Sequence, residues 1–306
     1  NIPYLLNELI KIENFIEIID VKGNWCEFNS PEDKKNFFLK SKHDTVFKVS
    51  KSIPEIKFID QLLINKEDWV KNKKSLLKKI ILKFKKKKII IRSSSLLEDK
   101  DNQSNAGKYL SIGNILPKNK DSLEKNINKV FSSYNINNPE DVVFIQEFIE
   151  KVDISGVLFT RTLGTNLPYY VCNYDDRTGL TDTITSGSNF NSKTFYLLKN
   201  KINLIKNKNL KKLLLIANKI EQLTSQNNLD IEFAIKKGNI FIFQTRYLFI
   251  NKNSIPDKEY YKIANKNFKG LKNYFKKAKN YTNQNIILSN MSDWNPAEIL
   301  GLNPNN

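Results

Sequence analysis

The stretch "LDIEFAIKKGNIFIFQTRYLFI", residues 229–250, is the most informative segment of the sequence for the fold. Apolar and polar residues alternate on both sides of "KKGN", which predicts two antiparallel strands joined by a short turn. Side chains alternate between the faces of a strand, so Asp230 and Glu232 share one face, as do Gln244 and Arg246 on the returning strand. The pattern predicts a hairpin on which two carboxylates, an amide and a guanidinium can converge.

This hairpin face has two interpretations. Carboxylate and amide oxygens are hard ligands of the kind that Mg²⁺ takes, and a guanidinium beside them fits a phosphoryl group. A solvent-facing hairpin with a cross-strand salt bridge would carry the same residues. The hairpin by itself does not decide between them.

A second informative stretch is "IIIRSSSLLEDKDNQSNAGKYLSI", residues 89–112, in which an apolar strand ends on an arginine followed by a polar loop. The chain holds four arginines, Arg92, Arg161, Arg177 and Arg246, against a large excess of lysine. Arginine is needed where a planar fork must bind phosphate or carboxylate at two points. We therefore expect the strand to deliver Arg92 to an anion, the alternative being a strand followed by a solvated loop.

The composition indicates a globular protein. The 306 residues are 40% hydrophobic and include 19 phenylalanines, enough for one large domain or two lobes. No apolar run reaches the roughly 20 residues of a membrane span, and the N-terminal residues do not resemble a signal peptide. The two cysteines, Cys26 and Cys172, are far apart in the sequence, as is typical of reduced thiols in a cytoplasmic protein. Because residue 1 is not methionine, we expect a processed or trimmed chain.

The formal net charge of +18 raises the question of a nucleic-acid-binding module. The excess is lysine at helix-surface positions, accompanied by many asparagines and isoleucines, which an AT-rich coding sequence would produce whatever the function. The arginines occur near acids, which repel a nucleic-acid backbone. We therefore expect no nucleic-acid partner and no membrane partner.

Strands and helices are mixed along the chain, which predicts an α+β protein with mixed or antiparallel sheets and flanking helices. We expect one lobe over residues 1–145, a second over 146–250, and a helical linker over 251–306. Within them, residues 44–50 and 53–64 have the β-branched and aromatic content of strands. Helices are expected over 65–84, with Asn65 as N-cap, over 120–135, with Asp121 as N-cap, and over 210–226.

Three blocks, taken together, resemble a known family. "IIIRSSSLLED…NAGKYLSI", "VVFIQEFI…DISGVLFTR…TSGS" and "LDIEFAI…GNIFIFQTR" are similar, in order and spacing, to the nucleotide-binding domain shared by phosphoenolpyruvate synthase and pyruvate phosphate dikinase. The resemblance covers roughly residues 40–250. It implies a two-lobed, ATP-grasp-like fold that holds ATP and Mg²⁺ between its lobes.

The resemblance also implies roles for single residues. Arg92 would hold the phosphates of ATP, and Glu232 and Gln244 would bind the metal. Gln146 and Glu147 would lie at the adenine and ribose. Asp230 and Arg246 would lie beside the phosphates. Lys42 would correspond to the family's early lysine, although the two glycines before that lysine are missing here. Ser155, Gly156 and Thr160 would lie on a largely structural strand. The loop behind Arg92, with Asp99, Gln103, Ser104 and Gly107, would fold over the phosphates.

Enzymes of this family pass phosphate through a histidine on a separate swivelling domain. The single histidine, His43 in "SKHDT", does not resemble that segment, so we interpret it as a surface or supporting residue. A downstream phosphohistidine domain is therefore an expected partner. "NYDDRTGLTDTITSGS" and "MSDWNPAEILG" are similar to the capsule-locus branch of the family. In the best-defined member of that branch, ATP yields AMP and phosphate while the amide nitrogen of L-glutamine is phosphorylated, which implies L-glutamine as the acceptor here. Pyruvate or another small acceptor is the alternative.

Overall fold

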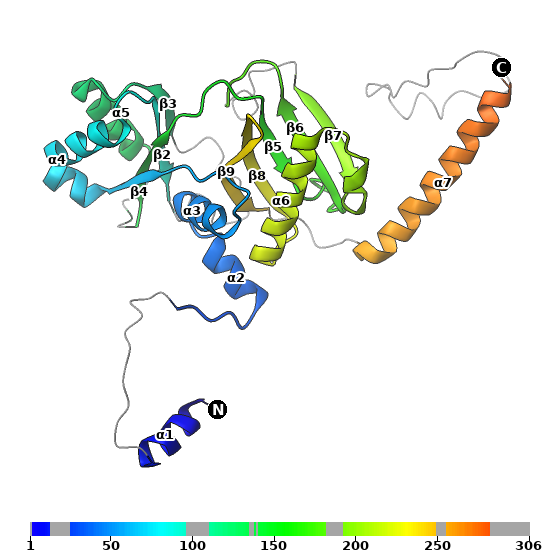
Figure 1. Ribbon diagram of the computed structural model, residues 1–306, viewed down its shortest axis with the longest axis horizontal. Coiled ribbons are helices and arrows are strands. Elements are labelled where there is room, and N and C mark those ends of the chain that lie inside the picture. The colour runs from blue at the N-terminus through cyan, green and yellow to red at the C-terminus, as the bar shows by residue number, and fades with distance from the viewer. Residues whose placement is uncertain are drawn as a thin grey trace. The chain divides into compact units, whose positions relative to one another are not determined.

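The computed structural model describes residues 2–12, 25–95, 110–134, 138, 140–181, 192–248 and 255–281 (Figure 1). The chain divides into two units, residues 1–252 and 253–306. The first unit holds two antiparallel sheets with helices against them, which confirms the α+β class. The second unit contains α7 (Asp257–Tyr281), a lysine-rich helix where the sequence predicts one.

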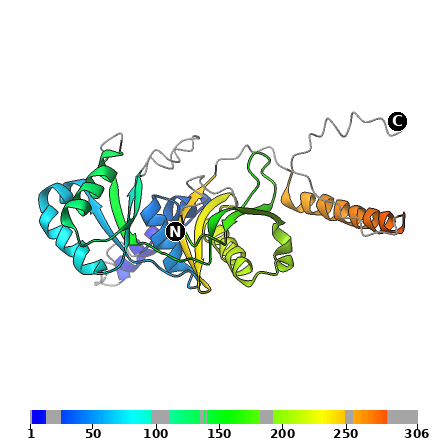
Figure 2. The same cartoon turned by 90° about the horizontal axis from the view of Figure 1, so that it is seen from above.

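The first sheet has the order β1-β4-β2-β3. Its strands are β1 (Gln61–Asn65), β2 (Ile89–Ser94), β3 (Ser111–Ile115) and β4 (Val142–Glu147). Two helices, α4 (Lys66–Phe84) and α5 (Lys120–Ser132), pack on one face of it (Figures 1 and 2). Apolar side chains at alternate strand positions, such as Ile89, Ile91 and Ile145, form a core with these helices. The intervening residues, including Arg92, therefore belong to the opposite face.

The second sheet has the order β7-β6-β5-β8-β9. Its strands are β5 (Ile154–Phe159), β6 (Tyr169–Asp175), β7 (Lys193–Leu198), β8 (Leu229–Lys236) and β9 (Asn239–Tyr247). The amphipathic helix α6 (Lys208–Thr224) buries Leu213, Leu214, Ala217 and Ile220 against this sheet. The helix is connected to β7 through the 3₁₀ helix η1 (Lys199–Leu204). The core is continuous along one face of the sheet.

The N-terminal part of the described chain contributes to the core of the second sheet. Three helices precede β1: α1 (Ile2–Ile12), α2 (Pro31–Phe38) and α3 (Lys42–Ser52). Val49, Ile53 and Ile56 join the second core, and Ile56 forms a parallel bridge to Ile240 of β9. The chain thus reaches the second sheet before it builds the first, and the division at residue 145 stays a prediction.

The structure corrects three expectations about local structure. Residues 44–50 are helical in α3 rather than extended, because Val46, Val49 and Ile53 are buried at helical spacing despite their β-branched side chains. Of the predicted strand over residues 53–64, only residues 61–64 are in a strand, as part of β1. The N-cap of α5 is Asn119, whose side chain accepts from the Ser122 amide, rather than Asp121. The predicted Asn65 cap of α4 is confirmed.

In the part of the chain that the structure describes, no helix combines the length and apolarity required to cross a membrane. Cys26 is exposed and Cys172 is buried, and neither forms a disulfide. Burial raises the pKa of the Cys172 thiol, so this cysteine is an inert core residue.

Glu221 is a buried carboxyl group on α6. It accepts a hydrogen bond from the Tyr170 hydroxyl at 3.1 Å and pairs with Lys199. Burial nevertheless raises the pKa of Glu221 above its ordinary value, with Lys199 acting in the opposite direction. Charging this group therefore opposes folding, although both partners are present.

This burial predicts a pH-dependent stability difference between the wild type and Glu221→Gln. A raised folded-state pKa gives the carboxyl a stabilising contribution that is complete below its unfolded pKa and is lost as pH rises through the folded pKa. The free energy of unfolding of the wild type should thus fall relative to that of the variant as pH rises from about 4.3, the ordinary glutamate pKa. Urea unfolding at a series of pH values measures both free energies, and a wild-type stability that rises relative to that of the variant as pH increases would contradict the raised pKa.

Candidate functional site

The hairpin of β8 and β9 places the four predicted residues on one face. Asp230 lies opposite Arg246, and Glu232 lies opposite Gln244, and directly opposed residues of an antiparallel pair share a face. The other face of β8 carries Ile231 and Phe233, which belong to the core under α6, and this core fixes the register. The convergence expected from the alternation is therefore present in the structure.

Asp230 and Arg246 form a bonded pair on this face. The Nε of Arg246 donates to Asp230 Oδ2 at 2.7 Å, and an Nη lies 2.6 Å from the same oxygen. Burial raises the pKa of Asp230 to about 6, while Arg246 lowers it and Glu232 raises it further. The other oxygen, Oδ1, is buried and has no hydrogen-bond partner among the residues that the structure describes. A buried carboxylate oxygen with unused capacity is where a cation or another donor would be stabilising.

Arg92 connects the two sheets at this face. One Nη donates to the carbonyl oxygen of Phe243 at 2.7 Å, and the other lies 3.5 Å from Glu232 Oε2. The guanidinium carbon is 5.5 Å from the ring centroid of Phe144, its cross-strand neighbour on β4. The predicted arginine of the first sheet therefore meets the predicted carboxylate of the second.

A β-bulge explains why the backbone carbonyl of Phe243 can accept a hydrogen bond from Arg92. The register of β8 and β9 shifts between Glu232 and Phe233, so Phe243 is the extra residue on β9. Bulges bend a strand and leave one residue outside the ladder, and they are frequent beside functional sites. Here the bulge frees the Phe243 carbonyl for Arg92.

The remaining predicted residues are distributed unevenly. Gln146 is buried on the same face as Phe144, and its Nε2 is 3.4 Å from Gln61 Oε1. Glu147, the next residue, has its side chain on the opposite side of the strand and pairs with Lys87 at 2.6 Å. Lys42 is buried at the start of α3. Gln146 therefore lies on the sheet face that carries Arg92, whereas the side chain of Glu147 lies on the other face.

The other two arginines do not reach this face through any described contact. Arg161 is buried and donates to the carbonyl oxygen of Asn166 at 2.7 Å, which closes the loop after β5. Arg177 is exposed in a turn. Of the four arginines, Arg92 and Arg246 are the two whose described contacts lie on the hairpin face.

The strand that includes Ser155, Gly156 and Thr160 has structural contacts. Ser155 donates to the Leu180 carbonyl at 2.6 Å, and Thr160 donates to the Asn227 carbonyl at 3.0 Å. The loop residues Asp99, Gln103, Ser104 and Gly107 lie outside the described residues, as does "MSDWNPAEILG".

Several residues that the sequence reasoning missed lie beside Arg92. His43 is hydrogen-bonded to Ser94, which shares a strand face with Arg92, and its ring is 6.3 Å from that of Phe144. Gln61 donates to the backbone carbonyl of His43 at 3.2 Å. The alternation in "IRSS" and "FIQ" could have indicated Ser94 and Phe144, because each is two residues from a predicted site residue. Nothing in the sequence pattern brings His43 to them.

The oxygen donors on the hairpin face fit Mg²⁺ better than a transition metal. Two carboxylates and an amide are hard ligands, and Mg²⁺ commonly takes one or two carboxylates, keeps several waters and binds phosphate oxygens. Among the described residues no group of three or more His, Cys, Asp or Glu could hold a metal ion by itself. Glu232, Gln244 and the unused Asp230 oxygen therefore offer hard oxygen donors on one face of the hairpin.

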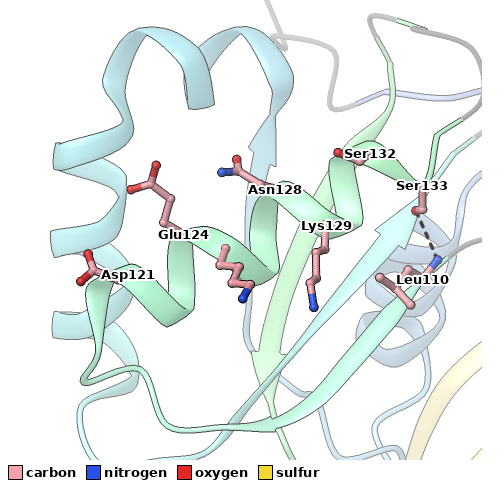
Figure 3. Close-up of a pocket in the computed structure, with 8 residues that line it drawn as sticks. Leu110, Asp121, Glu124, Asn128, Lys129, Ser132 and Ser133 are labelled. Carbon is pink, nitrogen blue, oxygen red and sulfur yellow. Dashed lines mark hydrogen bonds between the residues drawn. The ribbon is translucent and has the colours of Figure 1, made fainter.

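A separate pocket of about 770 Å³ lies on the first sheet's side of the molecule, along α5 (Figure 3). Asp121 and Glu124 lie at one end of it, and Lys129 and Ser133 at the other, with Leu110 opposite Ser133. None of the predicted site residues lines it. The pocket is therefore distinct from the face that carries Arg92 and Glu232.

Comparisons with known proteins give weak structural similarities. No protein-family model matches the sequence, and no curated protein matches it. The chain is similar to D-alanine–D-alanine ligase from Bacillus anthracis, at 15% identity and TM-score 0.37, covering 69% of this chain and 57% of that one. It is also similar to the Chryseobacterium gregarium RiPP-associated ATP-grasp ligase in complex with ADP and a leader and core peptide, at 10% identity and TM-score 0.39, covering 68% and 51%.

D-Alanine-D-alanine ligase from Helicobacter pylori is a third similar structure, at 10% identity and TM-score 0.38, covering 68% of this chain and 51% of that one. The chain thus spans about half of the length of these proteins. Similarities at this level do not assign an activity or a site to the chain.

Proposed function

We propose that this chain is the Mg²⁺-dependent, ATP-grasp-like ATP-binding part of a phosphotransferase that relays phosphate through a histidine on a further domain. The observation that carries the proposal is the meeting of Arg92 with the β8–β9 hairpin. A guanidinium from one sheet lies 3.5 Å from a carboxylate of the other, on a face that also holds Gln244 and the Asp230–Arg246 pair. The guanidinium groups suit phosphate oxygens, and the carboxylate and amide oxygens suit a divalent cation.

The residues of this face would act by positioning and by charge neutralisation. In phosphoryl transfer the protein contributes mainly geometry and electrostatic stabilisation. Arg92, whose side chain is held by the Phe243 carbonyl and Phe144, would bind phosphate oxygens with its forked donors. Arg246, anchored by Asp230, would neutralise further charge. Glu232 and Gln244 would be the protein ligands of a bound Mg²⁺, which would supply positive charge against the phosphates.

Three of the proposed residues have less structural support. Gln146 shares a strand face with Phe144, the cross-strand neighbour of Arg92, and would contact the adenosine. Glu147 would reach the nucleotide only by leaving Lys87. Lys42 is buried next to His43 and would serve as a phosphate-binding lysine. These assignments stay proposals that rest on the family resemblance.

For the acceptor we propose L-glutamine, phosphorylated on its amide nitrogen as ATP yields AMP and phosphate, in capsular phosphoramidate synthesis. The support is the resemblance of "NYDDRTGLTDTITSGS" and "MSDWNPAEILG" to the capsule-locus branch. Pyruvate, as in phosphoenolpyruvate synthase, is the second candidate. AMP release measured with glutamine and with pyruvate, in the protein that carries the downstream domain, separates the two acceptors. AMP release that neither compound stimulates would contradict both.

Calorimetry of this chain with ATP tests the binding site itself. ATP should bind more tightly with Mg²⁺ than without it, and Glu232→Gln and Gln244→Ala should each remove that magnesium dependence. Glu67→Gln, the same exchange at an exposed glutamate of α4, is the matched control and should bind as the wild type does. Unchanged magnesium-dependent binding in Glu232→Gln would place the metal elsewhere.

A further inference from the structure

His43 is held in place by two serines. Its Nδ1 lies 3.0 Å from Ser94 Oγ and 3.1 Å from Ser41 Oγ. The backbone amide of His43 also donates to Ser94 Oγ at 3.1 Å. Ser94 is fully buried on β2, two residues beyond Arg92, and the ring of His43 is thus fixed against the strand that carries the guanidinium.

The same contacts select one form of the imidazole. Ser94 Oγ accepts the His43 amide proton, and its own hydroxyl proton needs an acceptor because a buried unpaired donor is costly. Within the described chain, His43 Nδ1 is the acceptor that contacts this hydroxyl. These hydrogen-bond partners assign the acceptor role to Nδ1 and the ring proton to Nε2. Burial lowers the pKa of His43, with Lys40 and Lys48 acting in the same direction and Asp44 opposing them, which agrees with a neutral ring.

The His43 ring lies on the sheet face that carries Arg92, because Ser94 and Arg92 share a face of β2. The His43 ring is 6.3 Å from Phe144, and the Arg92 guanidinium is 5.5 Å from the same ring. Gln61 donates to the His43 carbonyl and is also bonded to Gln146. Among the residues that the structure describes, Nε2 has no hydrogen-bond partner. A fixed neutral donor on the sheet face that carries a guanidinium suits an anionic oxygen.

We propose that His43 is a binding residue that donates its Nε2–H to a phosphate oxygen of a nucleoside triphosphate, and that Ser94 is the positioning residue that sets its tautomer. This inference rests on the proposed nucleotide site. It gives the single histidine a role in binding phosphate without forming a bond to phosphorus. It also explains why Ser94, a polar residue, occupies a fully buried strand position beside Arg92.

Nitrogen-15 NMR of histidine-labelled protein tests the proposal directly, because the chain contains one histidine. At pH 7 the free protein should show the neutral Nε2–H tautomer, and ATP should shift the Nε2 resonance while adenosine leaves it unchanged. Ser94→Ala should populate the other tautomer without unfolding the protein. An Nδ1–H tautomer in the wild type, or an Nε2 shift produced equally by adenosine, would overturn the proposal.

Binding measurements complete the test. His43→Phe, which keeps an aromatic ring and removes the donor, should weaken ATP by about tenfold, the value of a hydrogen bond to a charged group. It should leave adenosine affinity unchanged. If ATP binds the wild type but leaves Nε2 unmoved, His43 is not a ligand and the proposed function stands. If the folded wild type binds no ATP, the proposed function fails and this inference fails with it.

Discussion

Replacing Arg92 with methionine should weaken ATP binding by about 30- to 100-fold while changing adenosine affinity little. Hydrogen bonds to charged groups contribute about 1.5–3 kcal/mol, and each 1.4 kcal/mol is a factor of ten. Methionine keeps an unbranched side chain against Phe144 but supplies no donor to the Phe243 carbonyl or to a phosphate. The ATP affinity of Arg92→Lys should fall between those of the wild type and Arg92→Met, since lysine keeps the charge and lacks the planar fork. Calorimetry with both ligands measures the effect.

The control for this prediction is Arg177→Met, the same exchange at an exposed arginine in a turn, which should leave ATP affinity unchanged. Circular dichroism would show whether each variant folds, because Arg92 also joins the two sheets. An equal loss of ATP and adenosine affinity in a folded Arg92→Met protein would mean that Arg92 supports the fold and does not bind phosphate.

Replacing Gly156 with alanine should destabilise the protein strongly, because the second sheet leaves no room for the added methyl group. A Cβ at this position would lie 2.2 Å from the Asn173 carbonyl oxygen and 2.8 Å from the Tyr174 Cα, both backbone atoms of the neighbouring strand β6. Backbone paired on both sides cannot move aside as a side-chain tip can, and β5 pairs with both β6 and β8. Overpacking of this kind costs about 3 kcal/mol.

Urea unfolding followed by circular dichroism measures this loss as a lower midpoint. Gly270→Ala is the matched control, because nothing lies within 4 Å of its added Cβ and alanine favours a helix by up to about 1 kcal/mol. The control should not be destabilised. A Gly156→Ala midpoint equal to that of the wild type would show that β5 and β6 are farther apart than the structure has them.

The hairpin was predictable because two independent patterns agreed there. Alternation defined the strands and "KKGN" defined the turn, and Gly238 has the positive φ of 74° that such a turn requires. The core under α6 then fixed which face was buried. The convergence of Asp230, Glu232, Gln244 and Arg246 follows from these local rules without any long-range information.

The elements that were not predicted depend on tertiary contacts. Residues 44–50 favour a strand by composition, and the helix forms because Val49 packs into the second core and Val46 is also buried. The strand β7 has a weak pattern, with Lys193 and Thr194 exposed, and it forms by pairing with β6. Composition reports intrinsic preference, and packing overrides it at these positions.

The candidate site also depends on tertiary contacts that the sequence alone does not reveal. The resemblance named Gln146 and Glu147 together, but adjacent strand residues face opposite sides, and Lys87 holds Glu147. His43 is 51 residues before Ser94, and only the packing of α3 between the sheets brings them together. A sequence pattern can indicate which residue types serve a phosphate site, whereas the contacts across the sheets determine which of them meet.

The position of the metal tests the central claim most directly. A crystal of this chain grown with ATP and Mn²⁺, which binds the same hard oxygen ligands as Mg²⁺ and scatters anomalously, would locate the ion. The proposal predicts an anomalous peak at about 2.1 Å from oxygens of Glu232 and Gln244, a distance typical of such ions, with phosphate oxygens within reach of Arg92. Bound ATP with its metal and phosphates at another surface, such as the pocket along α5, would contradict it.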